Sequence, residues 1–214
     1  MFEPARLISR PANFSADDRL DWATIDSQSA LSPEFPPPFP EYAHQLDFRS
    51  RGKQSIKVSV PSGKIVRINQ NHFFPGTFAV GEKLLFTGFS NPGPLCLEFS
   101  RSVWGMGLNI QSDPQVPSGT PAPFPFTARV RVYDRQAQSL GEFSLPGLSK
   151  IAAGSGTTFI GLTQEQGQIA KVAIEVIENG VSIPFAINTL QLKTYSLVPA
   201  QGFKSIREYV AHFA

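Results

Sequence analysis

The chain has 214 residues and a formal net charge of +2, from 19 basic and 17 acidic side chains. A balance this even excludes net charge as a reason to bind nucleic acid or an anionic membrane, so we expect no nucleic-acid partner. No stretch of about 18 apolar residues is present to span a membrane. With 18 Phe, 19 Pro and 17 Gly, the composition favours short strands joined by turns. We therefore predict an all-β fold in a single domain, residues 1–214: a two-sheet antiparallel sandwich of jelly-roll type with a short C-terminal helix.

The first part of the chain, residues 1–45, is predicted to be an extended strap. Its start, 1–10, has no apolar run behind a basic region, so we expect no secretory signal in this chain. The proline-rich segment 32–42 enforces a polyproline-like path. Its aromatic side chains, Phe35, Phe39 and Tyr42, favour a strap held on the sandwich, and a ligand for a proline-recognising domain is the alternative.

The predicted sandwich, residues 46–195, begins with alternating apolar residues. Residues 56–60 and 66–68 read as two strands, and the turn residues 61–64 between them predict a hairpin. Basic side chains surround it: Arg49, Arg51, Lys53, Lys57 and Arg67. They form either an anion-binding patch or a solvated row that protects a sheet edge.

Further strands follow at spacings of about ten residues, a pattern typical of sandwiches and barrels. They are predicted over 83–87, 95–100, 104–111, 126–133, 140–145, 157–163, 169–177 and 183–193. The clearest is 126–133, where apolar and polar residues alternate and predict one buried face. The single cysteine, Cys96, lies in an apolar run and is predicted to be a small buried thiol.

The end of the chain, residues 200–214, is predicted to form the terminal helix. Phe203, Ile206, Val210 and Phe213 recur at helical spacing and form one apolar stripe. A helix this short needs a docking surface. We expect it to pack against its own sandwich, with an interfacial or partner-binding helix as the alternative.

Several short segments resemble a family of uncharacterised bacterial proteins, many of them exported and many ending in a PEP-CTERM sorting anchor. The segments are Asp21-Trp22, Val80 to Gly88, Val103 to Gly107, Phe126 to Asp134, Thr158 to Leu162 and Phe185 to Asn188. The resemblance implies a β-sandwich and export. This chain departs from the family's pattern in the turn after Asp134, which lacks the usual glycine, and in having no anchor after Leu192.

Motifs for chemistry are few. His44, His72 and His212 lack the partners of a zinc site, and no nucleophile elbow or phosphate-cradling loop is present. Glu98, Glu142 and Glu175 lie in predicted strands, where they are either solvated residues or a carboxylate pair of glycosidase type. Calcium is the more reasonable ion because loops rich in Asp and Asn supply oxygen ligands. The candidate ligands are Asp21, Asp134 and Asn188.

Three functional hypotheses remain open at this point. The leading one is a noncatalytic β-sandwich module that binds a glycan or a cell-surface component, which rests mainly on the resemblance. The second is a structural or assembly protein that forms a homo-oligomer through the strap and the terminal helix. The third is a carbohydrate-active enzyme.

Overall fold

The computed structural model describes residues 3–23, 44–63, 65–70, 78–88, 93–112, 124–149 and 157–195. The regular structure of these ranges is predominantly β-strand, with a short 3-10 helix, η1 (Pro11–Asn13). Among the described residues, no helix has the length and apolar character needed to cross a membrane. The proline-rich part of the predicted strap and the predicted terminal helix lie outside the described residues.

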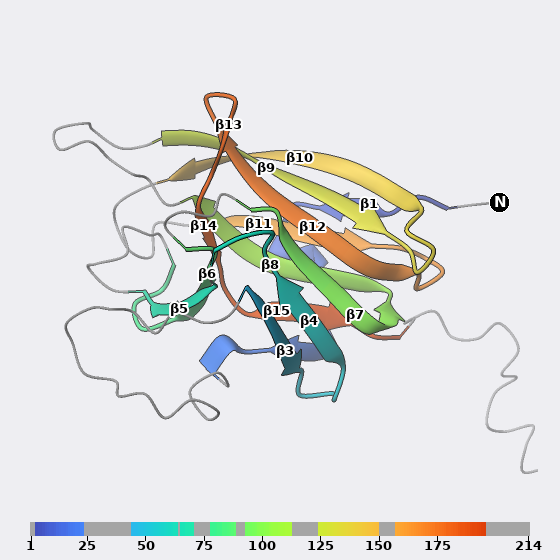
Figure 1. Ribbon diagram of the computed structural model, residues 1–214. Helices are drawn as coiled ribbons and strands as arrows, with labels where there is room; N and C mark the ends of the chain where they lie inside the picture. Colours follow the sequence, from blue (N-terminus) through green and yellow to red (C-terminus); the bar gives the residue numbers. More distant parts are fainter. Residues whose placement is uncertain are drawn as a thin grey trace, which may run out of the picture.

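Within the described residues, the strands form an eight-stranded and a seven-stranded antiparallel sheet on either side of the main core (Figure 1). The eight-stranded sheet runs β1-β11-β8-β14-β6-β5, and β15 pairs with both β8 and β2. Its strands are β1 (Arg6–Ile8), β2 (Asp18–Leu20), β5 (Val66–Asn69), β6 (Lys83–Phe86), β8 (Gly105–Ser112), β11 (Thr158–Thr163), β14 (Phe185–Ile187) and β15 (Leu190–Lys193). The seven-stranded sheet runs β10-β9-β12-β7-β4-β3, with β13 beside β12. Its strands are β3 (Gln45–Arg49), β4 (Ser55–Ser59), β7 (Leu95–Val103), β9 (Phe124–Tyr133), β10 (Ser139–Ser149), β12 (Ile169–Glu178) and β13 (Val181–Ile183).

The chain alternates between the sheets in jelly-roll order. Four strands lie as neighbours β6-β14-β8-β11 in one sheet, and four lie as β7-β12-β9-β10 in the other. Apart from the β9-β10 hairpin, each of these pairs joins strands that are not consecutive in the sequence, as two Greek keys require. The predicted all-β, two-sheet antiparallel sandwich is therefore confirmed.

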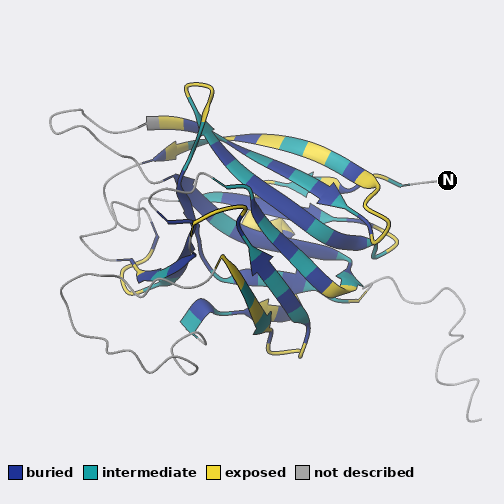
Figure 2. Cartoon of the chain, in the orientation of Figure 1, coloured by how far each residue is buried: buried dark blue, intermediate teal, exposed yellow. Residues whose placement is uncertain are grey.

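Alternating side chains place the core between the sheets. On β9, Phe126, Ala128, Val130 and Val132 are at most 4% exposed, as the alternation predicted. Figure 2 shows the same alternation of buried and partly exposed residues along the central strands. Each large apolar side chain buried this way contributes roughly 1.5–3 kcal/mol, so the pattern fixes which face of a strand points inward.

The predicted hairpin between residues 56–60 and 66–68 is wrong, although both strands exist. β4 pairs with β3 and β7, whereas β5 pairs with β6 in the other sheet. The connection between them crosses from one sheet to the other, and its flanking residues Val60 and Ile65 are buried in the main core. An alternating strand looks the same in either sheet, so the local pattern could not distinguish a hairpin from a crossing.

The outward face of the eight-stranded sheet is covered by other parts of the chain. A Cβ added at Gly107 would lie 3.0 Å from the Phe14 ring and 2.9 Å from the Phe159 ring, so these rings pack closely against the strand. The same sheet carries a second apolar cluster, formed by Val66, Ile68, Phe78, Leu84, Phe86 and Ala186. Leu85 and Ile187 alternate with cluster members and belong to the main core, so the cluster lies on the outward face.

The N-terminal segment connects the two sheets. The Asp18 carboxylate, in β2, accepts hydrogen bonds from the Gly52 amide at 2.6 Å and from the Ser50 hydroxyl, both in the turn between β3 and β4. The Trp22 indole is fully buried and donates to the Asn188 carbonyl at 2.7 Å. These contacts hold residues 18–22 against both halves of the sandwich.

Candidate functional site

The outward face of the seven-stranded sheet is polar, and no described segment lies in front of its central strands in Figure 1. Residues in register on neighbouring strands share this face because side chains alternate along each strand. One row crosses five strands, β3 to β9, and its first four residues alternate in charge. It consists of Asp47, Lys57, Glu98, Lys171 and Tyr133, and we name it the charged row.

Glu98 is held between two lysines in the charged row. Its Oε2 lies 2.8 Å from Lys57 Nζ, and its Oε1 lies 3.1 Å from Lys171 Nζ. The hydrogen bond from Lys57 lowers the pKa of Glu98, burial acts against this, and Lys171 lowers it further, so the pKa is below its ordinary value. The hydrogen bond to Glu98 raises the pKa of Lys171. Glu98 and Lys171 are therefore both charged at neutral pH.

A second ionic group lies on the same face around Glu175. Its Oε2 is 3.0 Å from Arg131 Nη2 and 3.6 Å from Arg129 Nη1, and its Oε1 accepts the Ser182 hydroxyl at 3.0 Å. Glu142 Oε1 lies 3.5 Å from Arg129 Nε. Burial lowers the pKa of Arg131, but Glu175 and Tyr133 together raise it above its ordinary value. We name Arg129, Arg131, Glu142 and Glu175 the arginine cluster.

Small side chains occupy the row beside the charged row. Ser59, Cys96 and Ala173 are direct neighbours on β4, β7 and β12, and the next residue along this row is Arg131 on β9. We name the three the small-residue row. A ligand can approach the sheet more closely here than over the long charged side chains that flank it.

Cys96 is half-buried on this face and forms no disulfide, whereas the sequence predicted a buried thiol. Its neighbours in the strand, Leu95 and Leu97, point into the core, so Cys96 points outward. Burial raises the pKa of the Cys96 thiol. The thiol is therefore protonated at neutral pH, a state that is a poor nucleophile.

Two of the three predicted calcium ligands, Asp21 and Asn188, lie in parts of the chain that are in contact, and the Asp21 carboxylate accepts the Ala23 amide at 3.0 Å. Trp22, the residue after Asp21, donates its indole N–H to the Asn188 carbonyl. The Asn188 side chain already has partners: its Oδ1 accepts the Asn109 amide at 2.7 Å, and its Nδ2 donates to Glu82 at 2.6 Å. Asn188 thus stabilises the short connection between β14 and β15.

The third predicted ligand, Asp134, lies in the β9-β10 turn of the other sheet. Its Oδ1 accepts the amides of Gln136 at 2.9 Å and Gln138 at 2.8 Å, which is the usual role of an Asp in a turn. Among the described residues, no group of three or more His, Cys, Asp or Glu side chains could hold a metal ion. Calcium binding stays a prediction.

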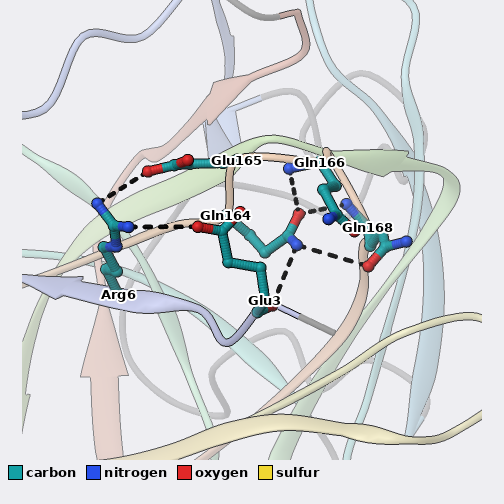
Figure 3. A network of polar contacts seen from close by, with 6 residues as sticks. All are labelled: Glu3, Arg6, Gln164, Glu165, Gln166 and Gln168. Atoms are coloured by element: carbon teal, nitrogen blue, oxygen red, sulfur yellow. Dashed lines mark hydrogen bonds and ion pairs between the residues drawn. The ribbon is translucent and has the colours of Figure 1, made fainter. Parts of the chain in front are cut away.

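The β11-β12 turn repeats this arrangement with a glutamine (Figure 3). Gln164 Oε1 accepts the amides of Gln166 at 2.9 Å and Gln168 at 3.0 Å, and its Nε2 donates to the Glu3 carbonyl at 3.2 Å. Gln164 is 2% exposed, so this amide is a structural group that fixes the turn. Sequence reasoning missed it, although the repeated spacing of a polar residue before two glutamines was a usable signal.

The sequence correctly placed the glutamates of the polar face on strands, but it did not predict which basic residues they pair with. Glu98, Glu142 and Glu175 were placed in strands, and all three lie on the outward face. Glu142 and Glu175 meet through the arginine cluster, whereas Glu98 belongs to the charged row. Only the strand register reveals that Lys171 faces Glu98.

No family model and no curated protein matches the chain. Among solved structures, it is similar to a DUF4465 family protein from Bacteroides caccae, with 12% identity, 88% of this chain and 100% of that chain covered, and a TM-score of 0.43. It is also similar to the enzymatically active domain of bacteriophage CBA120 tailspike protein 4 (13%; 64% and 19% covered; TM-score 0.28). A third similar structure is the CBM22-1 xylan-binding domain of Paenibacillus barcinonensis Xyn10C (10%; 71% and 87% covered; TM-score 0.26). Export, which the resemblance implies, stays a prediction.

Proposed function

We propose that the protein is a noncatalytic binding module whose ligand is a glycan chain lying across the outward face of the seven-stranded sheet. The observation that supports this best is the placement of hydrogen-bonding groups on both sides of the small-residue row. The charged row lies on one side, and Arg129 and Glu175 of the arginine cluster lie on the other.

The chemistry of this face suits a polyhydroxylated ligand. A sugar hydroxyl both donates and accepts hydrogen bonds, and the face offers ammonium and guanidinium donors next to carboxylate acceptors. Each charged side chain is already oriented by its ion-pair partner, as Glu98 is by Lys57 and Lys171. Binding therefore orders few additional side-chain rotamers, which lowers its entropic cost.

The ion pairs also favour an uncharged glycan on this face. An anionic ligand would have to compete with Glu98 for Lys171, and with Glu175 for Arg131. A neutral hydroxyl group can add to these pairs without breaking them. We therefore expect a neutral polysaccharide, bound with little dependence on salt concentration.

The protonation states of this face support binding over catalysis. A glycosidase needs a carboxylic acid whose pKa is raised so that it can protonate the leaving group. The pKa of Glu98 is lowered, and Glu175 contacts two arginines. The Cys96 thiol is protonated because its pKa is raised.

The test is a glycan array followed by calorimetry on variants of the small-residue row. Cys96→Trp should abolish binding to the neutral glycan that the array selects, because the indole fills the row, whereas Cys96→Ser should bind like the parent. Ser59→Phe, on the neighbouring strand, repeats the test at a second position. Melting temperatures identify any variant that fails to fold. Unchanged binding by both bulky variants, or no glycan bound by the parent, would refute the proposal.

A further inference from the structure

One end of the sandwich carries a cluster of cations that the polar face does not include. Its members are exposed and come from β2, β3, the β3-β4 turn and β7. They are Arg19, Arg49, Arg51, Lys53 and Arg101, and we name them the basic end.

Hydrogen bonds bring these residues together around the turn 50–54. The Arg51 amide donates to the Arg19 carbonyl at 3.0 Å. Gln54 Nε2 donates to the Arg101 carbonyl at 2.7 Å, and Arg101 Nε donates to Gln54 Oε1 at 3.3 Å. Lys53 lies within the turn, and Arg49 is the last residue of β3 before it. Three separate parts of the chain therefore place cations at one end.

Within the described part of the chain, the five charges of the basic end lie close together without acidic partners. Among the described residues, none of its five cations forms an ion pair with a carboxylate. Lys57, by contrast, pairs with Glu98, and Arg6 pairs with Glu165 at 2.8 Å. Asp18 does contact the turn, but its buried carboxylate accepts hydrogen bonds from Gly52 and Ser50. The charges of the whole chain nearly cancel, yet they are unevenly distributed.

The sequence left open whether Arg49, Arg51, Lys53, Lys57 and Arg67 formed an anion-binding patch. The structure divides this group. Lys57 belongs to the charged row, and Arg67 lies on β5 in the other sheet, where its Nη2 donates to Asn69 at 3.0 Å. The basic end includes Arg19 and Arg101 in place of Lys57 and Arg67. Only the tertiary structure shows that these two arginines lie beside the turn.

We propose that the basic end binds an anionic polysaccharide through its carboxylate, sulfate or phosphate groups, at a site distinct from the face assigned to the neutral glycan. Four of its five cations are arginines, whose planar guanidinium groups form bidentate hydrogen bonds to such groups. A flexible polyanion can follow the projecting turn and contact cations on several strands. Neither the five residues nor the turn 50–54 includes an aromatic side chain for stacking nucleic-acid bases or a large apolar one for insertion into lipid.

The test measures binding of the full chain to polygalacturonate and to dextran sulfate at low and high salt. The variant Arg51→Gln/Lys53→Gln should weaken binding at least about tenfold at low salt, and its salt dependence should be shallower because fewer counterions are released. The matched control, Arg6→Gln/Lys83→Gln, removes two positive charges elsewhere and should change affinity less than about twofold, as expected for cations outside the contact. Arg19→Gln, on a different strand, should also weaken binding.

Each other outcome overturns a specific part of the proposal. Equal weakening by the test and control variants would mean that net charge alone is responsible. The absence of polyanion binding would remove the site, and tighter binding to single-stranded DNA or to anionic phospholipid vesicles would change the class of partner. Neutral-glycan binding by the Arg51→Gln/Lys53→Gln variant, measured alongside, shows separately whether the proposed function holds.

Discussion

At the scale of single residues, the β9-β10 and β11-β12 turns are of the same kind, and each contains a residue with positive φ. The two turns use different residues at this position. In the β11-β12 turn, Gly167 has φ +65°, and in the β9-β10 turn the corresponding Ala137 has φ +60°. Positive φ costs a residue with a Cβ roughly 1–2 kcal/mol. The glycine that the family resemblance led us to expect after Asp134 is therefore missing at a position where the backbone favours it.

Ala137→Gly should stabilise the protein. Removing the Cβ relieves strain in the turn, and the greater freedom of glycine in the unfolded chain offsets part of the gain, leaving about 0.5–1 kcal/mol. Urea unfolding measures this difference. Gly167→Ala is the reciprocal variant and should destabilise, because its Cβ would also lie 2.6 Å from the Trp104 indole. A less stable Ala137→Gly protein would contradict this account of the turn.

Glu98 should make stability depend on pH in the acid range. Its pKa is lowered in the folded state from an ordinary value of 4.5, so its stabilisation is present above that value and is lost as the pH falls through the folded pKa. Because these pairs are partly exposed, Glu98→Gln should cost only roughly 0.5–1 kcal/mol at pH 7. The difference from the parent, followed by urea unfolding from pH 7 to pH 3, should shrink in acid. A difference that stays constant with pH would assign the effect to packing.

At the scale of elements, the sequence predicted strands well and their partners poorly. The alternation over 126–133 gave β9 and its buried face, because burial of one face imposes that pattern directly. The pairing of β4 with β7, and of β5 with β6, depends on contacts between distant residues that no local pattern encodes. For the same reason the glutamates of the candidate site could be placed on strands, but the pairing of Glu98 with Lys171 could not be found.

The Asp18 contact is an element-scale feature whose removal should be costly. Asp18→Ala leaves the Gly52 amide and the Ser50 hydroxyl without their acceptor in a largely buried place, at about 1–3 kcal/mol. Asp47→Ala removes a carboxylate from the exposed charged row and is the control, with an expected cost of about 0.5 kcal/mol or less. Thermal melting compares the two. Equal effects would mean that β2 does not depend on this contact for its position.

At the scale of the whole molecule, the two outward faces of the sandwich differ in burial and polarity. The outward face of the eight-stranded sheet packs against Phe14 and carries the buried second apolar cluster. The outward face of the seven-stranded sheet presents the charged row and the arginine cluster to solvent. This asymmetry, more than any single residue, is why we assign ligand binding to the seven-stranded sheet.

The most direct test of this assignment is to map bound ligand on the whole protein by amide chemical shifts. The labelled protein is titrated with the neutral oligosaccharide that binds most tightly on the array. We predict that the largest shifts fall at Ser59, Cys96 and Ala173 and at the adjoining Lys171 and Arg131, while the turn 50–54 and the Gln164 turn stay unchanged. Shifts confined to the turns, or to the eight-stranded sheet, would contradict the assignment.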